Sequence, residues 1–443
     1  MQSATNTNKS LLYTLLNEPL TFFGGLLLFL MVFSPTYNMA FKIVFIIILL
    51  ITVICSRILF DKLNVTKEVF LWYAILISHG IFFTIIGFLN KNNPYFVLRT
   101  TTYNIIWPVF YFIFTIGLYK RTSLIFLIRV LVITNFIVSL YLIGSALTLL
   151  HVLPPLGFLS FSMSQLDYDT TAGLVKVQIP AIISMMFTVP FLISFTLLSE
   201  KRSLGFKKWF LYASILLSII GIISSARRAL MLNVFFGVLF TIIFSWWANY
   251  SSRRILKKNM IWMVCGGLII LTGVLIAVAD SGFIDLSLVF QKFSEAFASK
   301  ENLSDKSVAI RYDQFDLLIK SWLQKPLLGH GHGAVSSFVV RSEKTPWMYE
   351  LSYVALLFQT GIIGLLIYLA LLGWPIYKGL TLLRKGNHET ALLLMPLMVG
   401  CTCFLIANGT NPYLQSYDNM WTLFFPVAVI NYLTKELSCP TMV

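Results

Sequence analysis

The chain has 443 residues, of which 58% are hydrophobic and 12% are charged, and its mean hydropathy is +0.82. Since a typical globular protein is about 25% charged, this composition excludes a soluble protein and indicates an integral membrane protein. The formal net charge of +15 would suggest nucleic-acid binding in a soluble protein, but the chain has no long basic run, and we expect no nucleic-acid partner. We predict a single transmembrane domain over residues 1–443.

Continuous apolar runs of roughly 17 to 25 residues, the length that crosses a bilayer, occur along most of the chain. A transmembrane β-barrel would show segments of alternating polarity instead, so we predict an all-α fold with about 12 transmembrane helices. The N-terminus lacks the features of a cleaved signal peptide, and the first run is expected to be retained. The predicted spans are 20–35, 39–54, 69–89, 102–119, 123–150, 179–199, 208–224, 229–249, 259–279, 349–377, 391–408 and 416–434.

The basic residues of the connecting segments predict the orientation, because Lys and Arg are retained on the cytoplasmic side. One alternating set of segments holds Lys9, Arg57, Lys62, Lys67, Lys120, Arg121, Lys201, Arg202, Lys207, Lys208, Arg253, Arg254, Lys257, Lys258, Lys378, Arg384, Lys385 and Lys435. The other set, apart from its one long loop, holds Lys91, Arg99, Lys176, Arg227 and Arg228. Both termini are therefore expected in the cytoplasm, and residues 280–348 outside.

The long loop between the ninth and tenth spans, residues 280–348, is expected to form a helical subdomain, since unstructured loops beyond about 15 residues are uncommon. Two apolar stripes at helical spacing predict amphipathic helices at the membrane surface. The first stripe is Phe283, Leu286, Val289, Phe290, Phe293 and Phe297, and the second is Phe315, Leu318, Ile319, Trp322 and Leu323.

Arg311 projects from the apolar face of the second predicted helix, four residues before Phe315. A charge there needs a partner. It either reaches lipid phosphates or pairs with Asp280 or Asp285, or it contacts an anion at the membrane surface.

The sequence GHGHG follows this helix. Gly329, Gly331 and Gly333 allow the backbone to approach a ligand or another helix closely and to adopt conformations closed to other residues. His330 and His332 make a weak metal site, because no carboxylate or thiolate is close in sequence. We predict no metal and no cofactor.

Arg227 and Arg228 lie in a short turn between the seventh and eighth spans, on the side where basic residues are scarce. Two guanidinium groups there are costly unless an anion meets them. Pairing with Asp280 or Glu343 is one interpretation. The other is a diphosphate carried on a lipid, because the planar fork of arginine suits phosphate.

Glu350 begins the tenth span. Its carboxylate either favours the helix dipole or acts as a general base that takes a proton from a sugar hydroxyl, while arginines hold a diphosphate leaving group. The segment 408–419, NGTNPYLQSYDN, precedes the last span. Its composition is typical both of an ordinary turn and of a sugar-binding element, which would use the side chains Asn411, Tyr413, Gln415, Tyr417 and Asp418.

Four motifs together resemble the O-antigen polymerase and ligase superfamily of bacterial envelope glycosyltransferases. They are SSARRAL, R-x(10)-W-x(3)-P-x(2)-GHGHG, E-x(2)-Y-x(3)-L-x(3)-G-x(2)-G and TNPYLQS, in this order from Gly221 to the end of the chain. The resemblance implies transfer of a glycan from undecaprenyl diphosphate to an acceptor hydroxyl on the periplasmic side, without a nucleotide sugar or a metal.

The resemblance also implies roles for particular residues. Arg227 matches the arginine of the family's Ser-Arg turn, with Ala226 in place of the common serine, and Arg311 matches the arginine that precedes the glycine-rich loop. We predict that Arg227, Arg228 and Arg311 bind the diphosphate and that Glu350 is catalytic. The predicted substrate-binding residues are His330, His332, Tyr353, Asn411, Tyr413 and Asp418.

The tenth span separates the branches of the family. Ligases of the family that this chain resembles attach glycan to lipid A core, and they share a His-Asn pair at the place where this chain has Glu350 and Leu351. The sequence therefore favours a repeat-unit polymerase. A ligase is the alternative, and a lipid-linked oligosaccharide flippase is the alternative of another class. The loop 280–348 and the few charges inside spans, Arg129 and Lys42, argue against a flippase.

The expected partners are an undecaprenyl-diphosphate-linked oligosaccharide, membrane lipid and a chain-length regulator protein. The expected location is the bacterial inner membrane, with the active site facing the periplasm.

Overall fold

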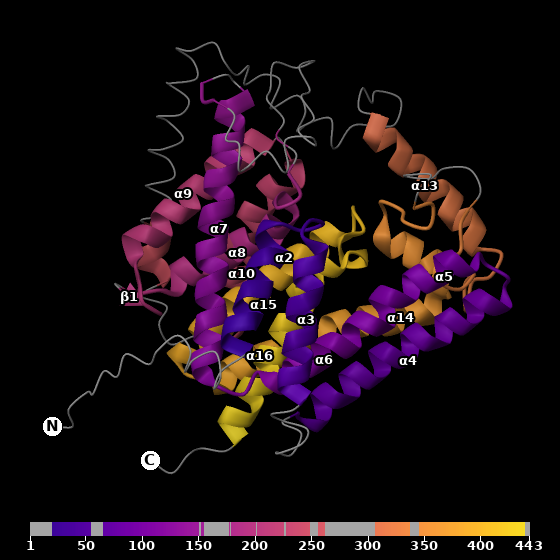
Figure 1. Cartoon of the computed structure of the whole chain (residues 1–443), viewed down its shortest axis with the longest axis horizontal. Coiled ribbons are helices and arrows are strands. Elements are labelled where there is room, and N and C mark those ends of the chain that lie inside the picture. The colour runs from indigo at the N-terminus through magenta and orange to yellow at the C-terminus, as the bar shows by residue number, and fades with distance from the viewer. Residues whose placement is uncertain are drawn as a thin grey trace.

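The regular structure of the described residues is almost entirely helical (Figure 1). The structure is a computed structural model, and it describes residues 20–54, 65–149, 152–154, 177, 179–200, 202–225, 227–248, 256–261, 306–336 and 345–438. Most of the ninth predicted span and the first amphipathic stripe of the long loop lie outside these residues.

Each predicted span other than the ninth contains a described helix, which confirms the all-α fold. The first half of the chain forms η1 (Leu20–Gly24), α2 (Gly25–Phe33), α3 (Met39–Val53), α4 (Lys67–Leu89), α5 (Pro94–Thr101), η3 (Thr102–Ile106), α6 (Trp107–Gly117) and α7 (Arg121–Leu149). The second half forms α8 (Ile182–Leu198), α9 (Lys208–Ser225), α10 (Arg228–Trp247), α13 (Lys306–Trp322), α14 (Ser352–Lys385), α15 (His388–Asn408), η7 (Tyr413–Gln415), η8 (Tyr417–Asn419) and α16 (Trp421–Ser438).

Five described helices, α4, α7, α10, α14 and α15, are long and apolar enough to cross a membrane. Shorter apolar helices, among them α3, α8 and α9, accompany them. Large apolar side chains such as Phe41, Phe70 and Phe235 are exposed on the helices. Such exposure is unfavourable in water but is the expected surface of a protein in lipid, so the chain is an integral membrane protein.

The helices α8 and α15 lie side by side in the interior of the bundle, and nearly all their residues are buried. A helix that is apolar on every side is suited to this central position. Gly400 of α15 permits the close approach, because a Cβ there would lie 2.8 Å from the carbonyl oxygen of Phe187. Around this centre, Figure 1 shows α9 on one side of the bundle and α5 and α13 on the other.

A short hairpin precedes α9, where the sequence predicts only a cytoplasmic connection. Strand β1 (Arg202–Ser203) pairs antiparallel with β2 (Phe206–Lys207). The two turn residues, Leu204 and Gly205, both have positive φ, 48° and 88°, as the tight turns of two-residue hairpins require.

Helix α14 is broken at Gly361, which has φ 63° and ψ −174°, and the break joins the helix to the GHGHG loop. Beyond the break, the amides of Ile362 and Ile363 donate to the carbonyls of Pro326 and Leu327 instead of to their own helix. The carbonyls of Phe358 and Gln359 that this exchange leaves free accept from the amides of His330 and Gly331, at 3.1 and 2.7 Å. The sequence predicts an uninterrupted span here; backbone groups of the loop replace the missing helical hydrogen bonds.

The loop itself is confirmed as a place of close backbone approach. Gly329, Gly331 and Gly333 have φ of 65°, 82° and 74°, and a Cβ at Gly331 would collide with the backbone of Gly87 in α4. The amide of His332 donates to the carbonyl of Phe83 in α4 at 3.0 Å. The glycines therefore let the loop pass between α4 and α14.

Candidate functional site

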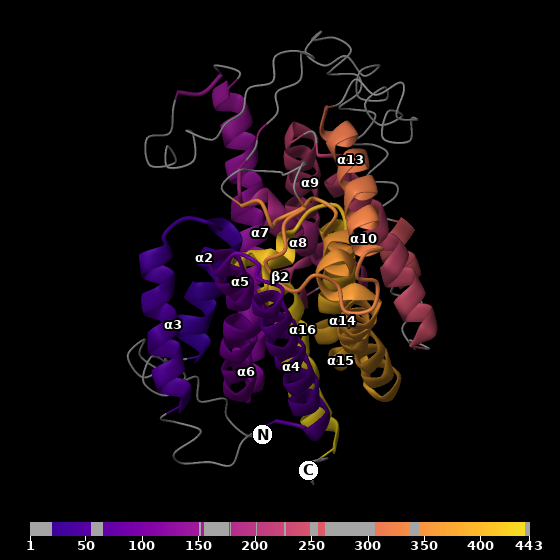
Figure 2. The same ribbon diagram turned by 90° about the vertical axis from the view of Figure 1, so that its right-hand side faces the viewer.

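The side chains of Arg311 and Glu350 form an ion pair. Arg311 Nε donates to Glu350 Oε2 at 2.6 Å, and the two side chains are 32% and 16% exposed. One turn further along α13, the buried Gln314 accepts a hydrogen bond from the backbone amide of Glu350 at 3.0 Å through Oε1. Helix α13 therefore holds both the carboxylate and the backbone of Glu350 at the start of α14. Figure 2 shows α13 at one end of the bundle, beside α14.

The face of α13 that carries Arg311 packs against α14, whereas the sequence predicts that it lies on the membrane surface, and the apolar stripe is narrower than expected. Leu318 is fully buried against Tyr349 and Phe358, whereas Phe315 and Leu323 are exposed. Arg311, Gln314 and Leu318 thus share the packed face. The partners proposed for Arg311 from the sequence, Asp280 and Asp285, lie outside the described residues, and the partner observed is Glu350.

Tyr349 fixes the segment in front of Glu350. Its ring is fully buried, and its hydroxyl accepts a hydrogen bond from the backbone amide of Ser336 at 2.6 Å. Ser336 Oγ in turn lies 3.1 Å from Ser321 Oγ of α13. These contacts connect α13, the loop after it and the start of α14, so the position of Glu350 is determined by packing on three sides.

The two histidines of GHGHG have different surroundings. His330 Nε2 lies 2.8 Å from the carbonyl oxygen of Ser321, and its ring lies against Phe358. His332 is buried, with Nδ1 3.3 Å from Thr84 Oγ1 and Nε2 3.4 Å from Asn104 Nδ2. Burial lowers the pKa of His332 to about 3, so its ring is neutral and offers a phosphate no charge.

A cavity lies beside His332, between η3, α14 and the segment before α16. Side chains from these elements line it, including Asn104, Ser352, Tyr353, Gln359 and Gln415. Two of the predicted substrate-binding residues, His332 and Tyr353, are thus brought to one cavity. The hydroxyl of Tyr353 donates to the carbonyl of Leu405 at 2.7 Å, which fixes its ring in the cavity wall.

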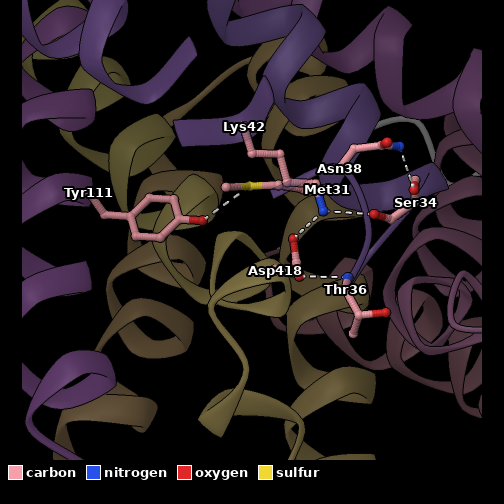
Figure 3. Close-up of polar contacts among 7 residues, drawn as sticks. All are labelled: Met31, Ser34, Thr36, Asn38, Lys42, Tyr111 and Asp418. Atoms are coloured by element: carbon pink, nitrogen blue, oxygen red, sulfur yellow. Dashed lines mark hydrogen bonds and ion pairs between the residues drawn. The ribbon is translucent and has the colours of Figure 1, made fainter. Parts of the chain in front are cut away.

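Asp418 has a different partner from the one predicted. Its carboxylate forms a fully buried ion pair with Lys42 of α3, with Asp418 Oδ1 2.6 Å from Lys42 Nζ. Its other oxygen accepts from the amide of Thr36 at 2.7 Å, and Lys42 also donates to the carbonyl of Ser34 (Figure 3). With both oxygens engaged and no exposure, this carboxylate connects two segments of the protein, and a contact between Asp418 and substrate stays a prediction.

The remaining predicted site residues are Asn411, Tyr413, Arg227 and Arg228. Tyr413 is buried against Phe404, and Asn411, at the turn, lies 3.4 Å from Thr410 Oγ1. Arg227 is half-buried and extended at the N-cap of α10, and Arg228 is the first residue of that helix. Among the described residues, no ion pair joins Arg227 to Glu350 or to another carboxylate. Its suggested partners Asp280 and Glu343 lie outside these residues.

Comparison with known families matches residues 213–369 to a family model described as O-antigen ligase. The match covers about a third of the chain and runs from α9 into α14, so it contains both Arg311 and Glu350. The match supports the resemblance of this chain to the O-antigen polymerase and ligase superfamily. No curated protein matches it.

Members of this superfamily are membrane enzymes of the glycosyltransferase type, polymerases or ligases, that act on lipid-linked glycans. The resemblance inferred from the four motifs is confirmed by the match. Membership is common to polymerases and ligases, so the choice between these two activities depends on the residues of the site itself.

Several residues of the site carry no signal in the sequence. Gln314 accepts a hydrogen bond from the backbone of Glu350, but the sequence does not distinguish it from the other polar residues of an amphipathic helix. Asn90 and Asn92, at the end of α4, donate from their side-chain amides to the carbonyl of His330 at 3.0 and 2.9 Å. These long-range contacts become visible only when the helices are in place.

Proposed function

We propose that the chain is a repeat-unit polymerase of surface polysaccharide in the bacterial inner membrane. The hydroxyl oxygen of a new lipid-linked unit attacks the anomeric carbon of the growing glycan. The bond from that carbon to the diphosphate oxygen breaks, undecaprenyl diphosphate leaves, and the hydroxyl proton passes to the Glu350 carboxylate. The Arg311–Glu350 pair carries this proposal, because it puts a base and a phosphate-binding group in direct contact.

The ion pair also supports an order of events. While Arg311 is bound to Glu350, the charges of both groups are neutralised. A diphosphate carries more charge than a carboxylate and offers several oxygens to the guanidinium fork, so it competes for Arg311. Binding of the donor then frees the Glu350 carboxylate to accept a proton, at the moment when the leaving group is held.

Arg227 supports a second contact to the diphosphate. It lies at the N-cap of α10, whose first turn contains no acidic residue and whose N-cap side chain makes no capping hydrogen bond. A helix N-terminus carries partial positive charge and free amides. We infer that Arg227, Arg228 and the first amides of α10 bind one phosphate and that Arg311 binds the other.

Glu350 also favours a polymerase over a ligase, because ligases of the family that this chain resembles have a His-Asn pair at this place. The test is deletion of the chain and gel electrophoresis of the lipopolysaccharide. A polymerase predicts lipid A core that bears a single repeat unit. Loss of even that unit, with lipid-linked polymer accumulating, indicates a ligase, and single units held on the cytoplasmic leaflet indicate a flippase.

A further inference from the structure

The loop from Pro326 to Gly333 forms its backbone hydrogen bonds with protein groups. The amides of residues 329–332 all donate to protein carbonyls, at 2.7 to 3.1 Å. The side-chain amides of Asn90 and Asn92 donate to the carbonyl of His330, and carbonyls at the start of the loop accept from amides beyond the break in α14. Irregular backbone at the depth of the lipid tails is tolerated only where protein groups satisfy it in this way.

The side chains of this loop are suited to lipid rather than to water. Residues 326–333 include no Asp, Glu, Lys or Arg, and Leu327 and Leu328 are 61% and 41% exposed. The helices that the loop contacts are apolar at this level as well, because Phe88 of α4 and Ile363 of α14 are also exposed. Exposure of these side chains to water is unfavourable, whereas a satisfied backbone with exposed apolar side chains fits a segment within a bilayer.

The position of the loop along α4 and α14 gives its depth. Glu68 and Lys378 form an ion pair between these helices, and charged side chains are costly in the hydrocarbon core, so the pair marks one edge of that core. The hydrogen bonds of the loop reach Phe83 and Ile363, which are each 15 residues from the pair along their own helix. At about 1.5 Å per residue that is about 22 Å, whereas the core is about 30 Å thick. The loop therefore lies about 8 Å inside the opposite edge.

The charged residue next to the loop supports this depth. Lys325 directly precedes the loop, and its Nζ donates to Asn90 Oδ1 at 2.6 Å, just beyond the C-terminal end of α4. Asn90 is 22 residues from Glu68, or about 33 Å, which is outside the core. The lysine thus directs its charge out of the hydrocarbon, while the residues that follow it remain inside.

We propose that residues 326–333 form a re-entrant loop in the bilayer, with Leu327 and Leu328 in contact with lipid acyl chains. The distribution of Lys and Arg predicts that the whole of 280–348 lies outside the membrane, whereas this loop enters the leaflet on the side of α13 and leaves it again. Tilt of α4 or α14 from the bilayer normal shortens their projection and places the loop deeper. This placement does not depend on the reaction that the chain catalyses.

The test is site-directed spin labelling of the full-length chain in lipid nanodiscs, with the five native cysteines replaced by alanine. Single cysteines are introduced as Leu327→Cys in the loop, Leu366→Cys on the exposed apolar part of α14 and Asp316→Cys on the exposed face of α13. Molecular oxygen concentrates in hydrocarbon and a polar nickel chelate remains in water. The ratio of their effects on the relaxation of the label therefore reports its depth.

We expect the oxygen-to-nickel ratio of Leu327→Cys to lie several-fold above that of Asp316→Cys and below that of Leu366→Cys, which is nearer the middle of the bilayer. A ratio equal to that of Asp316→Cys means that the loop lies in water. A label at position 327 that neither reagent reaches means that protein covers the loop. Either result overturns the proposal.

Leu328→Cys is a second site in the same loop, and it should give the same ratio if Leu327→Cys does not yield folded protein. Both leucines are exposed, so their replacement removes little packing within the protein. Failure of the loop placement leaves the proposed polymerase function unchanged. Identification of the chain as a ligase, in turn, leaves the loop placement unchanged.

Discussion

Arg311 and Glu350 are 39 residues apart in the chain and 2.6 Å apart in space. The sequence identifies Arg311 as a charge that needs a partner, because it lies on the apolar face of a predicted helix, and it identifies Glu350 as a residue that favours the helix dipole or acts as a general base. It does not indicate that they partner each other, since periodicity describes one helix at a time. The sequence proposes Asp280 or Asp285 as its partner, and only the packing of α13 on α14 brings Glu350 to Arg311.

We expect Glu350→Gln to reduce polymer formation by about 10²- to 10⁴-fold, because the amide retains the shape but accepts no proton. The measurement is polysaccharide length at matched protein level. The matched control is Asp316→Asn, which neutralises an exposed carboxylate of α13 and should leave polymer unchanged.

The double variant Arg311→Glu with Glu350→Arg distinguishes the role of Glu350 as general base from a structural role. It can re-form the ion pair with the charges reversed, so the folded protein should be recovered while polymer is not. Wild-type polymer length in Glu350→Gln or in the exchanged pair contradicts the role of Glu350 as base.

At the scale of elements, glycines lie where the backbone of one segment contacts the backbone of another. In α14, Gly361 has a positive φ and a Cβ there would collide with the carbonyl of Leu327, whereas a Cβ at Gly373 meets nothing within 4 Å. We expect Gly361→Ala to destabilise the protein by more than the roughly 1–3 kcal/mol of backbone strain. Gly373→Ala should be neutral or stabilising by up to about 1 kcal/mol. Thermal unfolding of both variants measures the difference, and equal stability contradicts the close packing of the GHGHG loop against the break in α14.

The pair of Lys42 and Asp418 joins α3 to the segment in front of α16 (Figure 3). Removal of one partner leaves a buried charge unpaired, so Lys42→Met should destabilise the protein by about 3–5 kcal/mol. The double variant Lys42→Met with Asp418→Leu should recover most of this loss, because apolar side chains of similar size replace the pair. A double variant no more stable than the single one, in thermal unfolding, contradicts this role.

The sequence is informative about elements where apolar runs are long, and uninformative where connections are decided by tertiary contacts. Runs such as 69–89 and 391–408 predict α4 and α15 to within three residues, because burial in lipid requires a continuous apolar helix. The break at Gly361 is hidden inside such a run. It becomes necessary only because the GHGHG loop donates hydrogen bonds to Phe358 and Gln359, and the sequence of α14 alone does not show the donors.

At the scale of the whole molecule, the distribution of Lys and Arg predicts that α13 faces the periplasm and the β1–β2 hairpin the cytoplasm. Lys320 of α13 and Lys207 of β2 are both exposed. With an impermeant thiol reagent on cells with a permeabilised outer membrane, and labelling of the native cysteines subtracted, Lys320→Cys should be modified and Lys207→Cys should not. The reverse pattern means that the orientation is inverted and that the proposed site faces the cytoplasm.

We propose that this chain joins lipid-linked repeat units to one another, with Glu350 as base and Arg311 as a diphosphate ligand. The most direct test supplies the purified chain in lipid vesicles with lipid-linked single units alone, without lipid A core or nucleotide sugar, and resolves the products by gel electrophoresis. We predict a ladder of lengthened glycans from the wild type and single units from Glu350→Gln. Product that forms only when lipid A core is added, with no lengthening of the glycan, would contradict the claim and identify the chain as a ligase.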